Sequence, residues 1–308
     1  MTQATETRTS PANLPAMAEA APSRDAGDPA LMHLDQKEGR GTGRLLLMEA
    51  VPGYLPTVWL LVLLILLWYG AVSLFHLPFY ILPTPAEVLN ALVSRGWNYL
   101  PDVATTLQEI LAGFGLGLVA AVPLAVLISL SWVVRRAVYP VLIASQMIPI
   151  FALAAIVTIM FAYGLLPEIV VTALYSFFPI VVTGADGLMS VDADHVNLLR
   201  GAGASRWQIM LRLRLPWSLP AFFSGAKLGI VFAVSGAAIG EWIGGQSGLG
   251  YLMRFQDSAL DVPGMFATVV VLSLLGVVLF AAVSLLEYML LPWNRAKRTD
   301  LGGLWRAR

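Results

Sequence analysis

Few residues of this chain could do chemistry, and those few are widely spaced. The sequence contains no cysteine, which excludes disulfides, thiolate metal sites and cysteine nucleophiles. Its three histidines, His33, His76 and His195, are far apart and form no pair at the spacing of metal ligands. None of its three lysines follows a glycine, so the chain has no Gly-Lys-Ser/Thr loop for binding a nucleotide phosphate. We therefore expect no catalytic residue, no metal and no bound cofactor.

Two charged residues, Lys227 and Glu241, lie in or beside one long apolar segment. Lys227 stands about ten residues into that segment, a rise of about 15 Å, which predicts a place near the middle of a bilayer. A charge at that depth faces protein or a water-filled cavity, so Lys227 either contacts a molecule in the cavity or pairs with an acid on a neighbouring helix. Glu241 follows about 21 Å further along nearly the same face, and we expect it at the outer mouth in a structural or gating role.

The composition of the chain indicates whether these residues lie in a soluble protein or in a membrane protein. Of the 308 residues, 58% are hydrophobic and only 12% are charged, whereas soluble domains carry about a quarter charged residues. The mean hydropathy is +0.75 and the formal net charge is zero. These values indicate a membrane protein and give no sign of a nucleic-acid partner.

Six segments are long and apolar enough to cross about 30 Å of hydrocarbon as helices. We predict an all-α membrane protein whose membrane domain spans 45–293, with kinks at Pro123, Pro149 and Pro179. The six predicted spans cover 57–75, 110–130, 138–161, 169–187, 217–240 and 263–286.

The basic residues orient these spans. With the amino terminus inside, sixteen of the nineteen lysines and arginines fall on the inner side, which predicts that both termini are cytoplasmic. Residues 1–44 show no sustained apolar period and no signal-peptide pattern, so we expect a disordered cytoplasmic tail there. Residues 294–308 form a basic cytoplasmic tail.

Two connections are longer than a turn requires. The outer one contains Leu82-Pro83-Thr84-Pro85 and then an apolar pattern, which predicts an amphipathic helix that begins at the second proline. The inner one, 188–216, has a helical pattern around a central Gly203, and we predict two short helices joined at that glycine. Its arginines, including Arg206, Arg212 and Arg214, are explained equally well by anchoring at the membrane surface and by a partner.

The inner connection carries a recognisable pattern. It resembles the signature of binding-protein-dependent ABC importer permeases, in which an acidic EAA triplet, a glycine and a later Ile-x-Leu-Pro form a coupling helix. Here nine residues separate the glycine from the second part of the pattern. The segment reads Asn197-Leu198-Leu199-Arg200-Gly201-Ala202-Gly203-Ala204-Ser205-Arg206-Trp207-Gln208, and Leu213-Arg214-Leu215-Pro216 follows.

The resemblance extends from about residue 59 to about residue 293 and is greatest to the nitrate, sulfonate and taurine branch of that family. Several elements look like those of permeases grouped with uptake of thiamine-precursor pyrimidines, while sulfonates, nitrate and riboflavin stay open. The three that do so are Gly240-Glu241-Trp242-Ile243-Gly244, Gly248-Leu249-Gly250-Tyr251-Leu252-Met253 and Leu291-Pro292-Trp293. Leu82-Pro83-Thr84-Pro85, Leu111-Ala112-Gly113-Phe114 and Phe177-Phe178-Pro179-Ile180 look like elements of the branch.

The resemblance implies a fold and partners. It implies a type I ABC importer permease in a bacterial inner membrane, working with a second permease subunit as a homodimer. Two cytosolic ATP-binding subunits, which use ATP and Mg, and an extracytoplasmic substrate-binding protein would complete the importer. The implied ATPase-coupling residues are Leu199, Gly203, Ala204, Ser205, Arg206, Trp207, Leu215 and Pro216.

Other positions are candidates for the translocation pathway, although aromatic residues in apolar spans also serve as packing. The pathway candidates are Gln146, Met147, Phe177, Phe178 and Lys227, and the candidates for the outer gate or binding-protein dock are Glu241, Gly248 and Gly250. Gly113, Gly115 and Gly117 have a spacing suited to close helix contact, either within the chain or across a dimer.

The sequence departs from the family pattern at three places. Asn197-Leu198-Leu199 stands where the acidic triplet would be, and Glu109 and Lys227 occupy positions where relatives often have arginine. Two other function classes compete with the importer subunit: an ATP-independent secondary transporter or channel, and an intramembrane enzyme. Neither an internal repeat nor a histidine within a span supports them.

Overall fold

The computed structural model describes residues 55–293, all of whose regular elements are helices. Both predicted tails, 1–44 and 294–308, and His33 lie outside the described residues. The chain divides within helix α2 (Leu55–Leu74) into two units, Met1–Leu63 and Leu64–Arg308. In the first unit the structure describes only the first half of this apolar helix, and everything below concerns the second unit.

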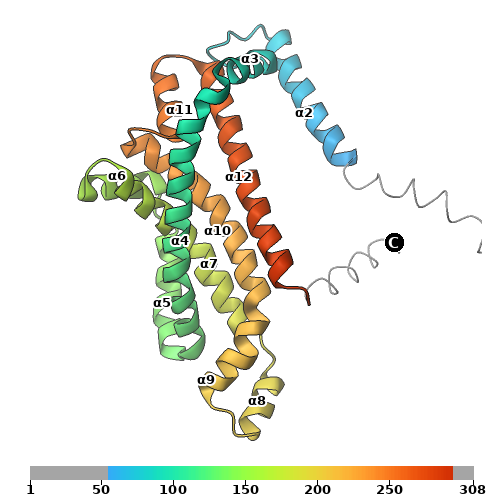
Figure 1. The fold of residues 1–308 in the computed structure, drawn as a ribbon, viewed down its shortest axis with the longest axis vertical. Coiled ribbons are helices and arrows are strands. Elements are labelled where there is room, and N and C mark those ends of the chain that lie inside the picture. Colours follow the sequence, from blue (N-terminus) through green and yellow to red (C-terminus); the bar gives the residue numbers. More distant parts are fainter. Residues whose placement is uncertain (1–54, 294–308) are drawn as a thin grey trace, which may run out of the picture. The chain divides into compact units, whose positions relative to one another are not determined.

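Figure 1 shows the helices of the second unit with their labels. Five helices in the described chain are long and apolar enough to cross a membrane, or six if one bent pair counts as a span, which agrees with the predicted all-helical fold. After α2 the elements are α3 (Pro85–Arg95), the 3₁₀ turn η1 (Gly96–Tyr99), α4 (Leu100–Leu130), α5 (Trp132–Ser145), α6 (Ile150–Phe161), α7 (Leu165–Met189), α8 (Ala193–Gly201), α9 (Arg206–Ile209), the π-helical turn η2 (Met210–Arg214), α10 (Leu215–Gly244), α11 (Leu249–Ser258) and α12 (Val262–Leu290).

The outer connection forms the helix that its prolines predict. Pro85 occupies the first turn of α3, where its missing N–H costs no hydrogen bond. Thr84 and Glu87 cap this turn reciprocally, because the Glu87 amide donates to Thr84 Oγ1 and the Thr84 amide donates to Glu87 Oε2. The Trp68 indole donates to the Pro83 carbonyl at 3.0 Å and fixes the entry to the helix.

The third predicted span, 138–161, is wrong as a single helix. The chain forms α5 and α6 instead, which meet at 97° across a break of four residues, Gln146 to Pro149. Pro149 has ψ 129° and no amide hydrogen, and a proline disfavours helical geometry in the residue before it. A break therefore replaces the predicted kink, whereas α4 and α7 continue through Pro123 and Pro179.

The core forms where α7 packs along α4 and α10. Small residues allow this approach: a Cβ on Gly113 would lie 2.9 Å from the Ile169 carbonyl oxygen, and one on Gly117 would lie 2.9 Å from that of Ala173. Of the two predicted alternatives, contact within the chain or across a dimer, the first therefore holds for Gly113 and Gly117, which face α7 of the same chain. A Cβ on Gly115 would meet nothing within 4 Å.

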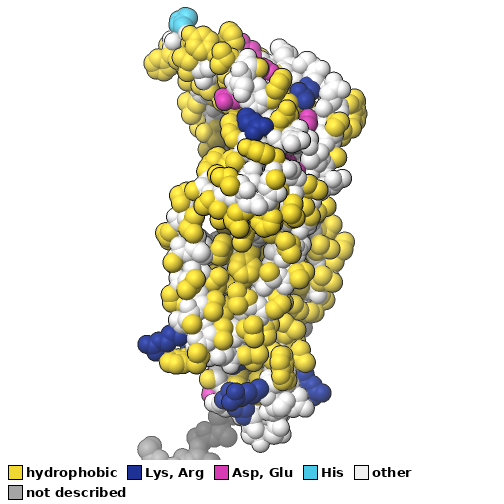
Figure 2. Space-filling view, turned by 90° about the vertical axis from the view of Figure 1, so that its left-hand side faces the viewer, with side chains coloured by type: hydrophobic (Ala, Val, Ile, Leu, Met, Phe, Trp, Pro, Cys, Tyr) yellow, Lys and Arg dark blue, Asp and Glu magenta, His cyan; other side chains and the backbone are white. Residues whose placement is uncertain are grey.

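The inner connection does not end at Leu215-Pro216, as the predicted limits 188–216 imply. Helix continues from Arg206 through η2 into α10, so one helical element covers 39 residues, Arg206 to Gly244. Pro216, which has no amide hydrogen, directly follows the π-helical turn η2, where the α-helical hydrogen-bond pattern is already interrupted. Figure 2 shows that charged side chains gather toward the two ends of the visible face, and that the band between them shows no charged side chain and is rich in hydrophobic ones.

Candidate functional site: the α8–α9 loop and the buried charges

A tight turn joins α8 to α9 at one end of the helices (Figure 1). Gly203 has φ +83°, a conformation that disfavours residues with a Cβ, although the space around it is open. Ser205 then caps α9, since it accepts from the Gln208 amide while Gln208 Oε1 accepts from the Ser205 amide at 2.7 Å. The turn at Gly203 and the short helix α8 before it agree with the prediction, whereas the second helix is not a separate short one, because α9 continues through η2 into α10.

One face of this loop is apolar and has no cover within the described chain. Leu198 is 73% exposed, Trp207 61% and Leu211 57%, while Ile209 and Met210 on the other face are buried in the bundle. Exposed apolar groups that gather in this way are typical of protein contact surfaces. Among the other predicted coupling residues, Arg206 is exposed, Leu199, Ala204 and Leu215 are half-buried, and Pro216 is exposed.

Lys227 pairs with an acid on a neighbouring helix. Its Nζ lies 2.5 Å from Glu287 Oε2, and the two side chains are 15% and 6% exposed. Glu287 stands in the last turn of α12, so Lys227 lies level with the end of that helix and not with its centre. The contact with Glu287 does not fix the depth of Lys227 in the bilayer, which stays a prediction. The role of Lys227 in a pathway stays a prediction.

The other pathway candidates lie at two further places. Phe177 and Phe178 make an edge-to-face ring pair at 5.4 Å and pack against the core between α4, α5 and α7. Gln146 and Met147 lie exposed at the break between α5 and α6. The five candidates therefore do not meet at one site within residues 55–293.

The three outer candidates do meet. The Gly250 amide donates to Glu241 Oε2, and Gly248, with φ +96°, lies directly against the Glu241 carboxylate. The Leu249 amide donates to Thr106 Oγ1 of α4 at 2.9 Å, so two side chains hold the start of α11. Arg254 caps the end of α10 by donating to the carbonyls of Trp242 and Gly245 at 2.8 and 2.9 Å.

Two further acids accompany Glu241. Glu109 of α4 and Glu168 of α7 are 0% and 4% exposed, and the carboxyl group of Glu109 lies within interaction range of those of Glu168 and Glu241. Neither oxygen of Glu109 has a hydrogen-bond donor among the described residues. No arrangement of acids and histidines in the described part of the chain could hold a metal ion. Glu109 and Glu241 therefore have three buried carboxyl oxygens without a donor in the described chain.

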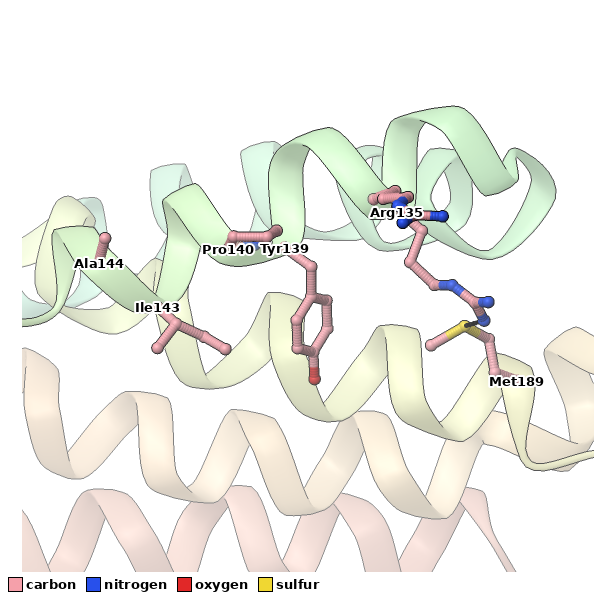
Figure 3. Close-up of a pocket in the computed structure, with 7 residues that line it drawn as sticks. Arg135, Tyr139, Pro140, Ile143, Ala144 and Met189 are labelled. Atoms are coloured by element: carbon pink, nitrogen blue, oxygen red, sulfur yellow. Dashed lines mark hydrogen bonds between the residues drawn. The ribbon is translucent and has the colours of Figure 1, made fainter.

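Basic residues line two pockets at the end that carries α8 and α9. Figure 3 shows the first, of about 570 Å³, where Arg135 reaches from α5 to the Met189 sulfur at 3.2 Å and Tyr139 points toward α7. The Tyr139 hydroxyl donates to Asp186 at 3.0 Å. The second pocket, of about 470 Å³, lies between the α4–α5 corner and the loop, and Arg200, Arg206 and Arg214 line it.

Sequence reasoning missed Glu168, Glu287 and the grouping of the arginines. Both glutamates stand at the ends of predicted spans, and an acid beside an apolar segment was a usable signal. The meeting of Arg200, Arg206 and Arg214 depends on the turn at Gly203, which folds α8 back toward α9, and spacing alone does not give that geometry.

Comparison with known proteins gives consistent matches. A family model described as "Binding-protein-dependent transport system inner membrane component" matches residues 113–290. The chain is 38% identical to the formylaminopyrimidine transport permease protein ThiX of Halalkalibacterium halodurans, over 78% of this chain and 96% of that protein. It is 33% identical to the riboflavin transport system permease protein RibX of Chloroflexus aurantiacus, over 76% and 88%.

A solved structure shows the same fold. An inward-facing conformation of the MetNI methionine ABC transporter contains a chain that matches with a TM-score of 0.56 at 20% identity. The match covers 64% of this chain and 97% of that chain.

Proposed function

Because the chain belongs to the family of binding-protein-dependent transport system inner membrane components, we propose that it carries a small organic solute through the membrane with energy from separate ATP-binding subunits. The family makes it the permease subunit of an ABC importer, not the ATPase. An extracytoplasmic binding protein delivers the solute, and a second copy of the chain completes the pathway. Both termini lie in the cytoplasm, on the side of the arginine-rich loop.

The exposed apolar face of the α8–α9 loop is the observation that supports this proposal. Leu198, Trp207 and Leu211 lie beyond the hydrophobic band, in a region rich in arginine, where exposed apolar area is unfavourable without a partner. The short helices and the capped turn at Gly203 make the surface rigid, so it suits a preformed groove on a cytosolic protein. A pair of ATP-binding subunits is the partner that importer chemistry requires.

The cycle follows from this contact. When the ATP-binding subunits close around ATP and Mg, they draw the two loops of the permease pair together. The helices that continue from the loops then turn from an inward-facing to an outward-facing arrangement. The binding protein releases its solute into the opened cavity, and hydrolysis restores the inward-facing state.

For the solute we propose a pyrimidine of the thiamine-precursor type. The support is the 38% identity with a formylaminopyrimidine permease, over nearly the whole of that relative. A riboflavin permease at 33% identity gives the main rival, and a taurine permease of Escherichia coli at 24% is more distant. Uptake of labelled formylaminopyrimidine and of riboflavin by cells that express the complete importer distinguishes these solutes.

Gly203→Asp tests the coupling role. The substitution puts a side chain and a charge on the positive-φ turn, and we expect ATP-driven uptake to be lost while membrane insertion is retained. Gly201→Asp is the matched control, because Gly201 also has open space around its Cα but ends α8 without a positive φ.

Co-purification with the ATP-binding subunit is the second readout. We expect recovery of that subunit with the wild type and the control, and a clear loss with Gly203→Asp. Uptake that persists in the Gly203→Asp variant would overturn the assignment of the loop. Uptake by the chain alone, without ATP, would replace the importer with a secondary transporter.

A further inference from the structure

The pocket between the α4–α5 corner and the α8–α9 loop contains uncompensated positive charge. Arg200 comes from the last turn of α8, Arg206 from the first turn of α9, and Arg214 from the turn before α10. Arg200 lies close enough to act electrostatically on Arg214, so like charges face one another across the pocket.

These positive charges have no acidic partner among the described residues. No aspartate or glutamate lines the pocket, and neither of the two ion pairs found within residues 55–293 involves its arginines. Arg214 donates from Nη1 to the Ser129 carbonyl at the end of α4, at 3.1 Å. Its Nε is buried and has no hydrogen-bond acceptor in the described chain. A half-buried guanidinium with an unpaired donor, beside two more arginines, favours the binding of an anion.

We propose that this pocket binds a phosphate group. Guanidinium groups match the oxygens of a phosphate in charge and geometry, and several arginines around one cavity of about 470 Å³ leave room for such a group. The hydroxyl of Ser131, which caps α5, and the start of that 14-residue helix lie at the same wall and add to the favourable field.

The apolar part of the lining favours a phospholipid as the source of the phosphate. Leu130 and Trp132 line the pocket at the point where the apolar helix α4 ends. Trp132 is 61% exposed, and Arg136 stacks on its ring at 5.0 Å, a combination typical of a membrane surface. Basic pockets at the ends of spanning helices bind anionic headgroups in this way. A lipid held here would touch both the transmembrane helix α4 and the loop helices.

Lipid binding to the purified full-length chain tests the proposal. The wild type is titrated with phosphatidylglycerol, phosphatidylcholine or inorganic phosphate in a neutral detergent, and bound ligand is counted by native mass spectrometry. We expect retention of phosphatidylglycerol over phosphatidylcholine, and an affinity about tenfold or more weaker in the double variant Arg200→Gln/Arg206→Gln. Both arginines are exposed, so this variant is expected to fold.

The matched control removes the same charge elsewhere. Arg135→Gln/Arg212→Gln takes two arginines from the same end of the molecule, but neither lines this pocket. We expect wild-type affinity in this control. Saturable binding of inorganic phosphate, lost in the pocket variant, would support the site and identify free phosphate as its ligand.

Three results would overturn the proposal. The first is equal binding of phosphatidylglycerol and phosphatidylcholine together with no binding of phosphate. The second is an equal loss of affinity in both double variants, which would show diffuse attraction to basic groups. The third is wild-type affinity for phosphatidylglycerol in the Arg200→Gln/Arg206→Gln variant, which would show that the pocket arginines do not hold the lipid. Since the readout is binding and not uptake, a failed coupling role for the loop would leave this test unaffected.

Discussion

The Lys227–Glu287 pair makes a quantitative prediction about the contact between α10 and α12. We consider Glu287→Leu, which keeps an apolar side chain of similar length at a position that is 5% exposed. The substitution leaves the Lys227 ammonium, 15% exposed, without the carboxylate that lies 2.5 Å away. Within the described residues Glu287 is its only ion-pair partner.

The magnitude follows from burial. Removing one partner of a buried ion pair costs about 3–5 kcal/mol, because an uncompensated charge stays in a medium of low polarity. We take the lower end, about 3 kcal/mol, since the pair lies at the last turn of α12 and Lys227 keeps some exposure. That change lowers the folding equilibrium constant roughly 150-fold. The double variant Lys227→Met/Glu287→Leu removes both charges and is expected within about 1 kcal/mol of the wild type.

The assay is reversible unfolding of the purified chain in mixed micelles with increasing denaturing detergent, followed by tryptophan fluorescence. The four proteins of the double-mutant cycle give a coupling energy, which we expect to exceed about 2 kcal/mol. A coupling below about 0.5 kcal/mol, or a single variant as stable as the wild type, would refute the reasoning. Uptake is a second readout. If the double variant is stable but does not transport, we infer that Lys227 contacts the solute in addition to pairing with Glu287.

The remaining predictions concern close contacts. Gly117→Ala should destabilise the bundle by about 1–3 kcal/mol, because its Cβ would lie 2.9 Å from the Ala173 carbonyl, whereas Gly115→Ala, in open space, should be neutral or slightly stabilising; chemical unfolding of both variants checks this. Gly250→Ala should loosen α11, because a Cβ there would press on the Ala238 carbonyl, and faster amide hydrogen exchange confined to α11 and its neighbours would show it. Glu109→Gln should stabilise the chain by about 1 kcal/mol, since its amide donates to the adjacent carboxyl groups; a loss of stability would mean that Glu109 has a donor outside the described residues.

Much of the fold could be predicted because its signals are local. The apolar segments, the Thr84–Glu87 cap and the turn at Gly203 each depend on residues within a few positions of one another. The break before Pro149 was harder, since the same residue type leaves α4 continuous at Pro123. Whether a proline bends or breaks a helix depends on what its neighbours can pack against, and a single sequence does not contain that information.

The candidate site also has a part that could be predicted from the sequence and a part that could not. The loop residues around Gly203 were predictable because they form one continuous segment. The partner of Lys227 comes from a helix 60 residues away in the sequence, and Glu287 was missed although it directly follows a predicted span. Glu109 lies close to Glu168 and Glu241 because of the way α4, α7 and α10 are rotated about their axes. The sequence does not define these rotations, because its apolar residues extend around the whole of each helix.

The uninterrupted helix from Arg206 to Gly244 gives the molecule a mechanical connection between its two ends. At 1.5 Å per residue it is a rod about 58 Å long, with Trp207 near one end and Glu241, which holds the start of α11, near the other. A torque applied at the loop therefore reaches the α10–α11 turn along one helical element, which contains a π-helical turn and two prolines near its start. The π-helical turn at Met210–Arg214 departs from α-helical winding, and it also contains Arg214 of the proposed anion pocket. An anion held by Arg214 would therefore contact this rod at its π-helical turn, on the path between the loop and the α10–α11 turn.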